Sequence, residues 1–232
     1  ALSADQWRVT LGGDRGIHGR KGKAFSPKTI LCNDQSEALT IEQVCQKWGY
    51  LERCQDDFRR AKVMLTPVSD SLHIVQIDEV SDVTLEQLRA DGFSPCVVVQ
   101  SNPNNHQVLL TTPKILELSE KQNSYLAKRV RQMLNKQYGK ATTNDSVQSF
   151  RAPGFKNMQS EVDGSCTTVA LRYAKRGDCA KLAHMFQRVR SAHSTAKKAA
   201  LLVVDVAQAQ ATQTIVAISG VRKTGASSCF FE

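Results

Sequence analysis

The sequence predicts an α+β fold with a partly antiparallel sheet, flanked by helices and followed by a helical segment. Two apolar, β-branched strand–turn–strand patterns, over residues 61–78 and 95–110, are typical of hairpins. Residues 84–92 and 117–138 show helical spacing of their apolar positions. Residues 178–212 contain many alanines and no glycine or proline, which predicts a C-terminal helical segment.

The first quarter of the chain predicts two strands and a helix. Residues 7–11 and 29–32 are short apolar stretches that indicate strands. Thr40 is followed three residues later by Gln43, which is the spacing of a capping box, and a helix is expected to begin there. Gly49 is expected to end that helix.

The later elements follow from equally local signals. A helix over 84–92 ends at a glycine, and the turn at 102–105 leads into the returning strand 106–110. A last strand is expected near residues 169–172. The outer face of the helix over 117–138 is predicted to be basic, and it carries Lys121, Lys128, Arg129, Arg131 and Lys136. Gly139 is expected to end this helix.

These elements divide the chain into two predicted domains. The sheet and its helices occupy residues 1–177, and the helical segment occupies 178–232. The end of that segment, residues 220–232, is rich in glycine and serine, which is typical of a disordered tail.

The strand over residues 72–80 ends in two adjacent acids, Asp78 and Glu79. Burying two unpaired carboxylates costs several kcal/mol or more, so both are expected at the exit of the strand. One interpretation is a divalent metal site, because Mg²⁺ prefers carboxylate oxygens and bridges them to phosphates. The alternative is a polar turn that caps the next helix.

Composition limits the possible partners. The 232 residues carry a net charge of +9, and this basic excess favours nucleic acid over a membrane surface. No run of about 18 apolar residues is present, so no transmembrane helix and no membrane partner are expected. The seven cysteines are scattered without a zinc spacing, which indicates reduced thiols and a cytoplasmic location.

Three motifs in order carry a resemblance to a known family. They are the strand ending in Asp78-Glu79, the turn from Ser101 to Gln107, and the stretch Arg151-Ala152-Pro153-Gly154-Phe155-Lys156-Asn157 after a long helix. This order resembles the catalytic domain of RepB-type plasmid DNA primases, of the archaeo-eukaryotic primase superfamily, over about residues 5–175. The resemblance implies a modified RRM-like core and primer synthesis in replication of a plasmid or related mobile element.

The resemblance also implies roles for individual residues. Asp78 and Glu79 correspond to a metal-binding pair for Mg²⁺ or Mn²⁺, and Asp145 corresponds to a third catalytic ligand. Relatives carry a further acid near Lys140, where this sequence has none, so the third ligand is open. The remaining residues correspond to a nucleotide-binding set, with His106 as a phosphate donor: Ser101, Asn105, His106, Arg151, Lys156 and Asn157.

The implied partners are a single-stranded DNA template, nucleoside triphosphates, and a replicative helicase or a relaxase. In this family a helical region after the core is thought to help the first dinucleotide form, and the alternative is a helix that only packs on the core. Two other functions stay open. One is a non-catalytic protein that binds single-stranded DNA or an origin. The other, a relaxase-type nuclease, needs a clustered histidine pair that the five histidines do not form.

Overall fold

The computed structural model describes residues 6–12, 28–31, 38–57, 62–141, 149–157 and 167–195. The chain divides into two compact units, residues 1–187 and 188–232. The predicted domain boundary at 177/178 stays a prediction. Asp145 and the glycine-rich end, residues 220–232, lie outside the described residues.

The described residues form an α+β fold with antiparallel sheets, which confirms the predicted fold class. The strands are β1 (Gln6–Gly12), β2 (Lys28–Leu31), β3 (Lys62–Val68), β4 (Leu72–Val80), β5 (Val97–Asn102), β6 (Asn105–Pro113), β7 (Phe150–Arg151), β8 (Lys156–Asn157), β9 (Thr167–Thr168) and β10 (Ala170–Ala174). The helices are α1 (Ile41–Gln46), α2 (Trp48–Asp57), α3 (Asp82–Ala90) and α4 (Glu120–Tyr138). A further helix covers residues 180–195.

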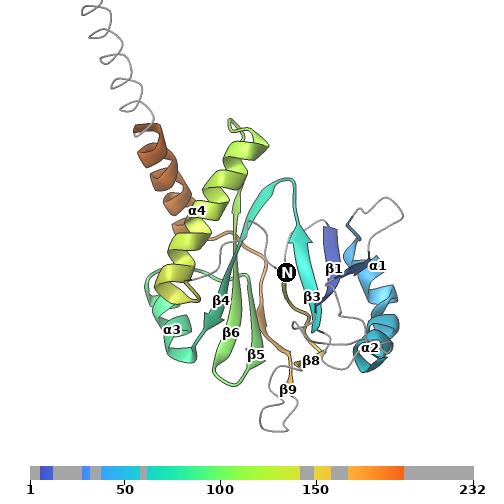
Figure 1. Ribbon diagram of the computed structural model, residues 1–232. Coiled ribbons are helices and arrows are strands. Elements are labelled where there is room, and N and C mark those ends of the chain that lie inside the picture. Colours follow the sequence, from blue (N-terminus) through green and yellow to red (C-terminus); the bar gives the residue numbers. More distant parts are fainter. Residues whose placement is uncertain are drawn as a thin grey trace, which may run out of the picture. The chain divides into compact units, whose positions relative to one another are not determined.

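Two four-stranded sheets enclose the main core of the first unit. One has the order β2-β1-β3-β7 and the other the order β10-β5-β6-β4. Val9 and Leu65 of the first sheet share one buried cluster with Val97, Val99 and Leu109 of the second. Helices α3 and α4 lie beside β4 and β6, whereas α1 and α2 lie beside β1 and β3 (Figure 1). The apolar alternation of the strands therefore faces inward, between the sheets.

The predicted hairpin between β3 and β4 is wrong. The two strands are consecutive, but they belong to different sheets. Both edges of β3 are occupied, one by β1 and the other by β7, so no edge remains for β4. The Ser69 hydroxyl accepts the backbone N–H groups of Ser71 and Leu72, which stabilises the turn between the sheets. Strand β4 pairs with β6 instead, antiparallel.

The predicted end of the first helix at Gly49 is also wrong. The capping box at Thr40 and Gln43 begins α1 as expected, but α1 ends at Gln46. After Lys47 a second helix, α2, runs through Gly49 to Asp57. Leu51 is fully buried against the core. This burial outweighs the low helix propensity of one glycine, about 1 kcal/mol.

The basic outer face predicted for α4 is wrong at one residue: Arg131 is buried, with only 1 % of its surface exposed. Lys121, Lys128, Arg129 and Lys136 are exposed as expected. The buried face of α4 contains Asn123 and Asn135 beside Leu126, Val130 and Leu134. Arg131 lies on this buried face, and nothing in the sequence indicated it because asparagines do not contribute to an apolar pattern.

The C-terminal helix begins inside the first unit. Its residues Leu182 and Phe186 are buried, and the Phe186 ring stacks on His73 with ring centroids 4.2 Å apart. The first two turns therefore pack on the core, and a role of this segment in forming the first dinucleotide stays a prediction. Among the described helices none is long and apolar enough to cross a membrane. Four described cysteines are free thiols: Cys45, Cys54, Cys96 and Cys179.

His73 is a buried titratable group under this helix. Its Nε2 lies 3.1 Å from Asn123 Oδ1. The amide nitrogen of Asn123 donates to the carbonyls of Ile115 and Leu118, so Oδ1 is the acceptor and His73 carries its proton on Nε2. Burial lowers the pKa of His73 to about 4. The folded protein therefore favours the neutral ring.

Stability should consequently fall as the pH falls from about 6.5 to about 4. In that range the unfolded chain binds a proton at His73 that the folded chain excludes, which costs about 3 kcal/mol in all. Urea unfolding at a series of pH values measures the loss. In His73→Gln, which keeps a donor for Asn123 but does not titrate, the decline should be shallower by that amount. Equal declines in both proteins would show that His73 is not responsible.

Candidate active site

The two acids at the end of β4 lie in a β-bulge. Ile77 pairs with Val108 and Val80 pairs with His106, so Asp78 and Glu79 together oppose the single residue Gln107. Glu79 has a φ of 57°, in the left-handed region that costs a non-glycine residue about 1–3 kcal/mol. Bulges with such strain occur often next to active sites, where they redirect side chains. Here the bulge turns two consecutive carboxylates out of the strand.

A buried asparagine of α4 replaces the hydrogen bonds that β4 loses at the bulge. Asn135 is 0 % exposed, and its Oδ1 accepts the backbone N–H of Asp78 at 3.0 Å. Its amide nitrogen donates to the carbonyl of Gln76 at 2.9 Å. The carbonyl of Asp78 accepts the backbone N–H of Lys140, just after α4, at 2.9 Å. The end of α4 thus holds the backbone that carries the acids.

Gly139 allows this close approach. A Cβ at position 139 would lie 2.3 Å from the carbonyl oxygen of Asp78 and 2.8 Å from Cγ2 of Ile77. Any larger residue would therefore push the end of α4 away from the bulge. The sequence identified Gly139 only as the end of a helix, and its contact with the acids is a feature of the tertiary structure.

Gln107 connects the acids to the third motif. Its Nε2 donates to Oδ1 of Asp78 at 2.9 Å, and its Oε1 accepts the backbone N–H of Arg151 at 2.7 Å. The side chain is buried between the sheets. Sequence analysis did not select Gln107, although a glutamine before the apolar run 108–110 is a signal that could have found it.

The second and third motifs meet at Asn157. The guanidinium of Arg151 donates to Oδ1 of Asn157 at 2.6 Å. The amide nitrogen of the buried Asn157 donates to the carbonyl of Ser101 and to Oδ1 of Asn102, both at 2.6 Å. The structure therefore brings together three residues that the resemblance placed in one nucleotide site: Ser101, Arg151 and Asn157. Asn105 joins them through the Ser101 hydroxyl, which donates to its carbonyl at 3.4 Å.

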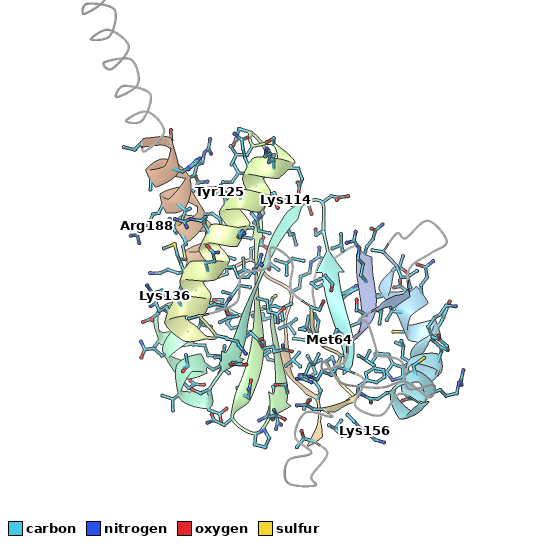
Figure 2. The ribbon with its side chains drawn as sticks, viewed as in Figure 1. Met64, Lys114, Tyr125, Lys136, Lys156 and Arg188 are labelled. Atoms are coloured by element: carbon cyan, nitrogen blue, oxygen red, sulfur yellow. The ribbon has the colours of Figure 1, made fainter. Side chains whose placement is uncertain are left out.

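Lys156, the first residue of β8, is held by its backbone and has an exposed side chain (Figure 2). Gln55 of α2 accepts the backbone N–H of Lys156 at 2.9 Å and donates to its carbonyl at 2.8 Å. This glutamine pair fixes the strand next to Asn157. The exposed side chain of Lys156 thus adds a positive charge to the third motif.

His106 lies on the other face of β6. Successive strand residues point to opposite faces, so Gln107 faces the acids and His106 faces α3. Its Nε2 lies 2.6 Å from Oδ1 of Asp82, in the first turn of α3. Its Nδ1 is buried without a hydrogen-bond partner among the described residues. The structure does not bring His106 to Asp78 and Glu79.

Lys140, near the position where the resemblance implies a further acid, pairs with Glu79. The ammonium lies 2.6 Å from Oε1 of Glu79, and both side chains are about half exposed. The hydrogen bond to Glu79 raises the pKa of Lys140. Lys140 therefore supplies a positive charge at the acidic pair.

The donor set at the bulge fits a hard divalent cation. Asp78 and Glu79 supply carboxylate oxygens, and Mg²⁺ is commonly held by one or two carboxylates together with substrate phosphates. The described residues contain no group of three or more histidine, cysteine, aspartate or glutamate side chains that could hold a metal. Such a cation would thus depend on the two acids, on Asp145 outside the described residues, and on the substrate.

Comparisons with known proteins agree on one family. Residues 22–200 match the RepB DNA-primase N-terminal domain. A DNA primase of Acidithiobacillus ferrooxidans is 29 % identical over 188 residues, which are 78 % of this chain and 50 % of that protein. The chain thus spans half the length of this curated relative.

Two solved structures have the same fold. The catalytic domain of primase RepB′ in complex with initiator DNA matches with a TM-score of 0.63 and 18 % identity, over 84 % of this chain and 90 % of that chain. Primase RepB′ matches with a TM-score of 0.64 and 16 % identity, over 94 % of this chain and 65 % of that chain.

Proposed function

Because the chain belongs to the family of RepB DNA-primase N-terminal domains, we propose that it synthesises short primers on a single-stranded DNA template. The observation that carries this proposal is the bulge, which presents Asp78 and Glu79 and which Gln107 joins to Arg151. A link between two carboxylates and a motif that contains Arg151 and Lys156 supports this proposal, because joining nucleotides through phosphates requires stabilisation of negative charge. The role is replication of a plasmid or related mobile element.

Asp78 and Glu79 would hold Mg²⁺ or Mn²⁺, with Asp145 as the further ligand. When bound, such an ion neutralises triphosphate charge and lowers the pKa of the attacking 3′-hydroxyl. The protein's own contribution is to hold the carboxylate of Asp78. The N–H of Glu79 and the amide of Gln107 both donate to Oδ1 of Asp78, at 3.1 and 2.9 Å. These bonds hold the carboxylate of Asp78 in one orientation.

Arg151 and Lys156 are the groups that would bind the triphosphate. Arg151 is oriented by Asn157, and a guanidinium is the side-chain group that matches phosphate oxygens best in geometry and charge. Lys156 is exposed beside it along the same motif. Ser101 and Asn105 form the neighbouring turn and complete the nucleotide site.

For His106 the geometry favours a supporting role. Its partner Asp82 begins α3 directly after the bulge, and Val80, which closes the bulge, pairs with His106. A phosphate contact would require the ring to reach the other face of β6. We therefore assign His106 to fixing the start of α3 against β6, which keeps the bulge in place.

The proposed partners are a single-stranded template, nucleoside triphosphates, and a replicative helicase or a relaxase. The net charge of +9 suits the template. The exposed cations of α4 form one candidate surface: Lys121, Lys128, Arg129 and Lys136 (Lys136 in Figure 2).

Primer synthesis can be tested with the full chain, circular single-stranded DNA, labelled nucleoside triphosphates and Mg²⁺ or Mn²⁺. Short labelled oligonucleotides should form, and EDTA should abolish them. DNA binding without any incorporation, with or without an annealed primer, would contradict the proposal and assign the chain to non-catalytic DNA binding.

A further inference from the structure

The strand β10 forms an exposed edge with an unusual surface. Among the described residues it pairs only with β5, and its side chains beyond Ala170 are exposed. Leu171 is 53 % exposed and Tyr173 is 38 % exposed. Arg172 lies between them, and Lys175 and Arg176 follow, all three exposed. Asp178, also exposed, is the nearest acid in the sequence. We call residues 171–176 the β10 edge.

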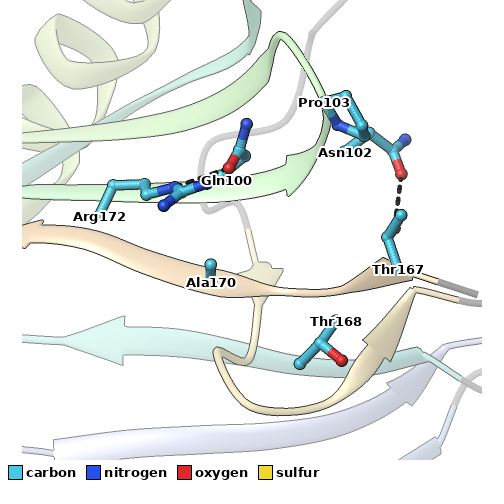
Figure 3. A pocket seen from close by; sticks show the side chains of 7 residues that line it. All are labelled: Gln100, Asn102, Pro103, Thr167, Thr168, Ala170 and Arg172. Carbon is cyan, nitrogen blue, oxygen red and sulfur yellow. Dashed lines mark hydrogen bonds between the residues drawn. The ribbon is translucent and has the colours of Figure 1, made fainter.

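A cavity of about 280 Å³ adjoins the β10 edge (Figure 3). Its lining includes Gln100, Asn102, Pro103, Thr167 and Arg172. Among the described residues that line the cavity, Arg172 is the charged one and none is an acid. Arg172 donates from Nε to Oε1 of Gln100 at 2.6 Å, which fixes the guanidinium at the wall. A fixed guanidinium and neutral polar groups suit a phosphate or the polar edge of a base.

One wall of the cavity is shared with the proposed nucleotide site. Oδ1 of Asn102 accepts from the Thr167 hydroxyl at 3.2 Å and from the amide of Asn157 at 2.6 Å. Asn157 in turn orients Arg151. A strand of nucleic acid on the β10 edge would therefore run directly up to the site where a nucleotide is joined.

We propose that the β10 edge and its cavity bind the single-stranded template next to the nucleotide site, an assignment that rests on the proposed function. Single-stranded nucleic acid is held by a basic track together with aromatic faces on which bases stack. Tyr173 supplies the face, and Arg172, Lys175 and Arg176 supply the track. A free strand edge can also bind an extended peptide. We favour DNA, because its phosphates complement the positive charges of the β10 edge.

The proposal can be tested by fluorescence anisotropy of a labelled single-stranded oligonucleotide with the full chain. Lys175→Ala with Arg176→Ala should weaken binding about tenfold and make the slope of log affinity against log salt shallower by about 1.4, since each phosphate contact contributes about 0.7. Tyr173→Ala should weaken binding about tenfold, and Tyr173→Phe should restore it, because only stacking is needed.

A matched pair on α4, Lys121→Ala with Lys128→Ala, removes the same charge from another exposed surface. It should change binding less than the Lys175/Arg176 pair. Wild-type binding by the β10-edge variants, or a larger loss in the α4 pair, would overturn the proposal even if the wild-type chain makes primers. A different outcome separates the two proposals. If the wild-type chain makes no primers but the β10-edge variants still lose DNA binding, the DNA-binding site is supported and the proposed primase activity is rejected.

Discussion

Replacing Asp78 by asparagine is expected to reduce primer synthesis by a factor of about a thousand. The amide keeps the shape of the side chain and can still accept the hydrogen bond from Gln107 at the same oxygen. It lacks the negative charge that a divalent cation requires, and such a cation contributes several kcal/mol to phosphoryl chemistry. The rate of labelled oligonucleotide formation at saturating nucleotide concentration measures the effect.

The matched control is Glu86→Gln, which makes the same chemical change on the exposed face of α3. Its primer synthesis should equal that of the wild type. The melting temperature of Asp78→Asn should stay close to that of the wild type, because the backbone bonds of residue 78 do not involve the carboxylate. Primer synthesis at the wild-type rate by Asp78→Asn would exclude this acid from catalysis.

Replacing Gln107 by leucine is expected to cost primer synthesis roughly tenfold to a hundredfold. Leucine fills a similar volume but makes neither the bond to Asp78 nor the bond to Arg151. Small displacements of a catalytic group can cost about a hundredfold. The partly buried N–H of Arg151 also loses its acceptor, which should lower the free energy of unfolding by about 1–3 kcal/mol. Primer-extension rates and urea unfolding measure the two effects.

Gln107→Glu tests the hydrogen bond to Asp78 separately from the hydrogen bond to Arg151. Its carboxylate can still accept the N–H of Arg151, but it cannot donate to Asp78 and it places a like charge beside it. We expect a rate at least as low as that of Gln107→Leu. An extension rate near the wild-type value in Gln107→Glu would show that the bond to Asp78 is not needed.

The antiparallel α+β fold was predictable because its signals are local. Capping residues, turn residues and apolar alternation located β5, β6, α3 and the start of α1 within a few residues. The hairpin predicted between β3 and β4 failed although its local pattern resembles that of β5 and β6. The difference lies in which strand edges are already paired, and no short stretch of sequence contains that information.

Only the charged residues of the candidate site could be selected from the sequence. Two adjacent acids after an apolar strand made Asp78 and Glu79 candidates for a metal site, because two unpaired carboxylates are costly to bury. Gln107, Asn135 and Gly139 were missed, since an amide in a strand or helix and a glycine at a helix end have ordinary local explanations. Their contacts arise when α4 and β6 meet the bulge of β4.

The central claim is that Asp78 in the bulge binds a divalent cation, and Mn²⁺ binding followed by electron paramagnetic resonance tests it most directly. Titration of the full chain, without nucleotide and with a nucleoside triphosphate, gives the affinity independently of any activity. We expect saturable binding by the wild type and by Glu86→Gln, and at least about tenfold weaker binding by Asp78→Asn. Equal Mn²⁺ affinity in Asp78→Asn and the wild type would contradict the claim.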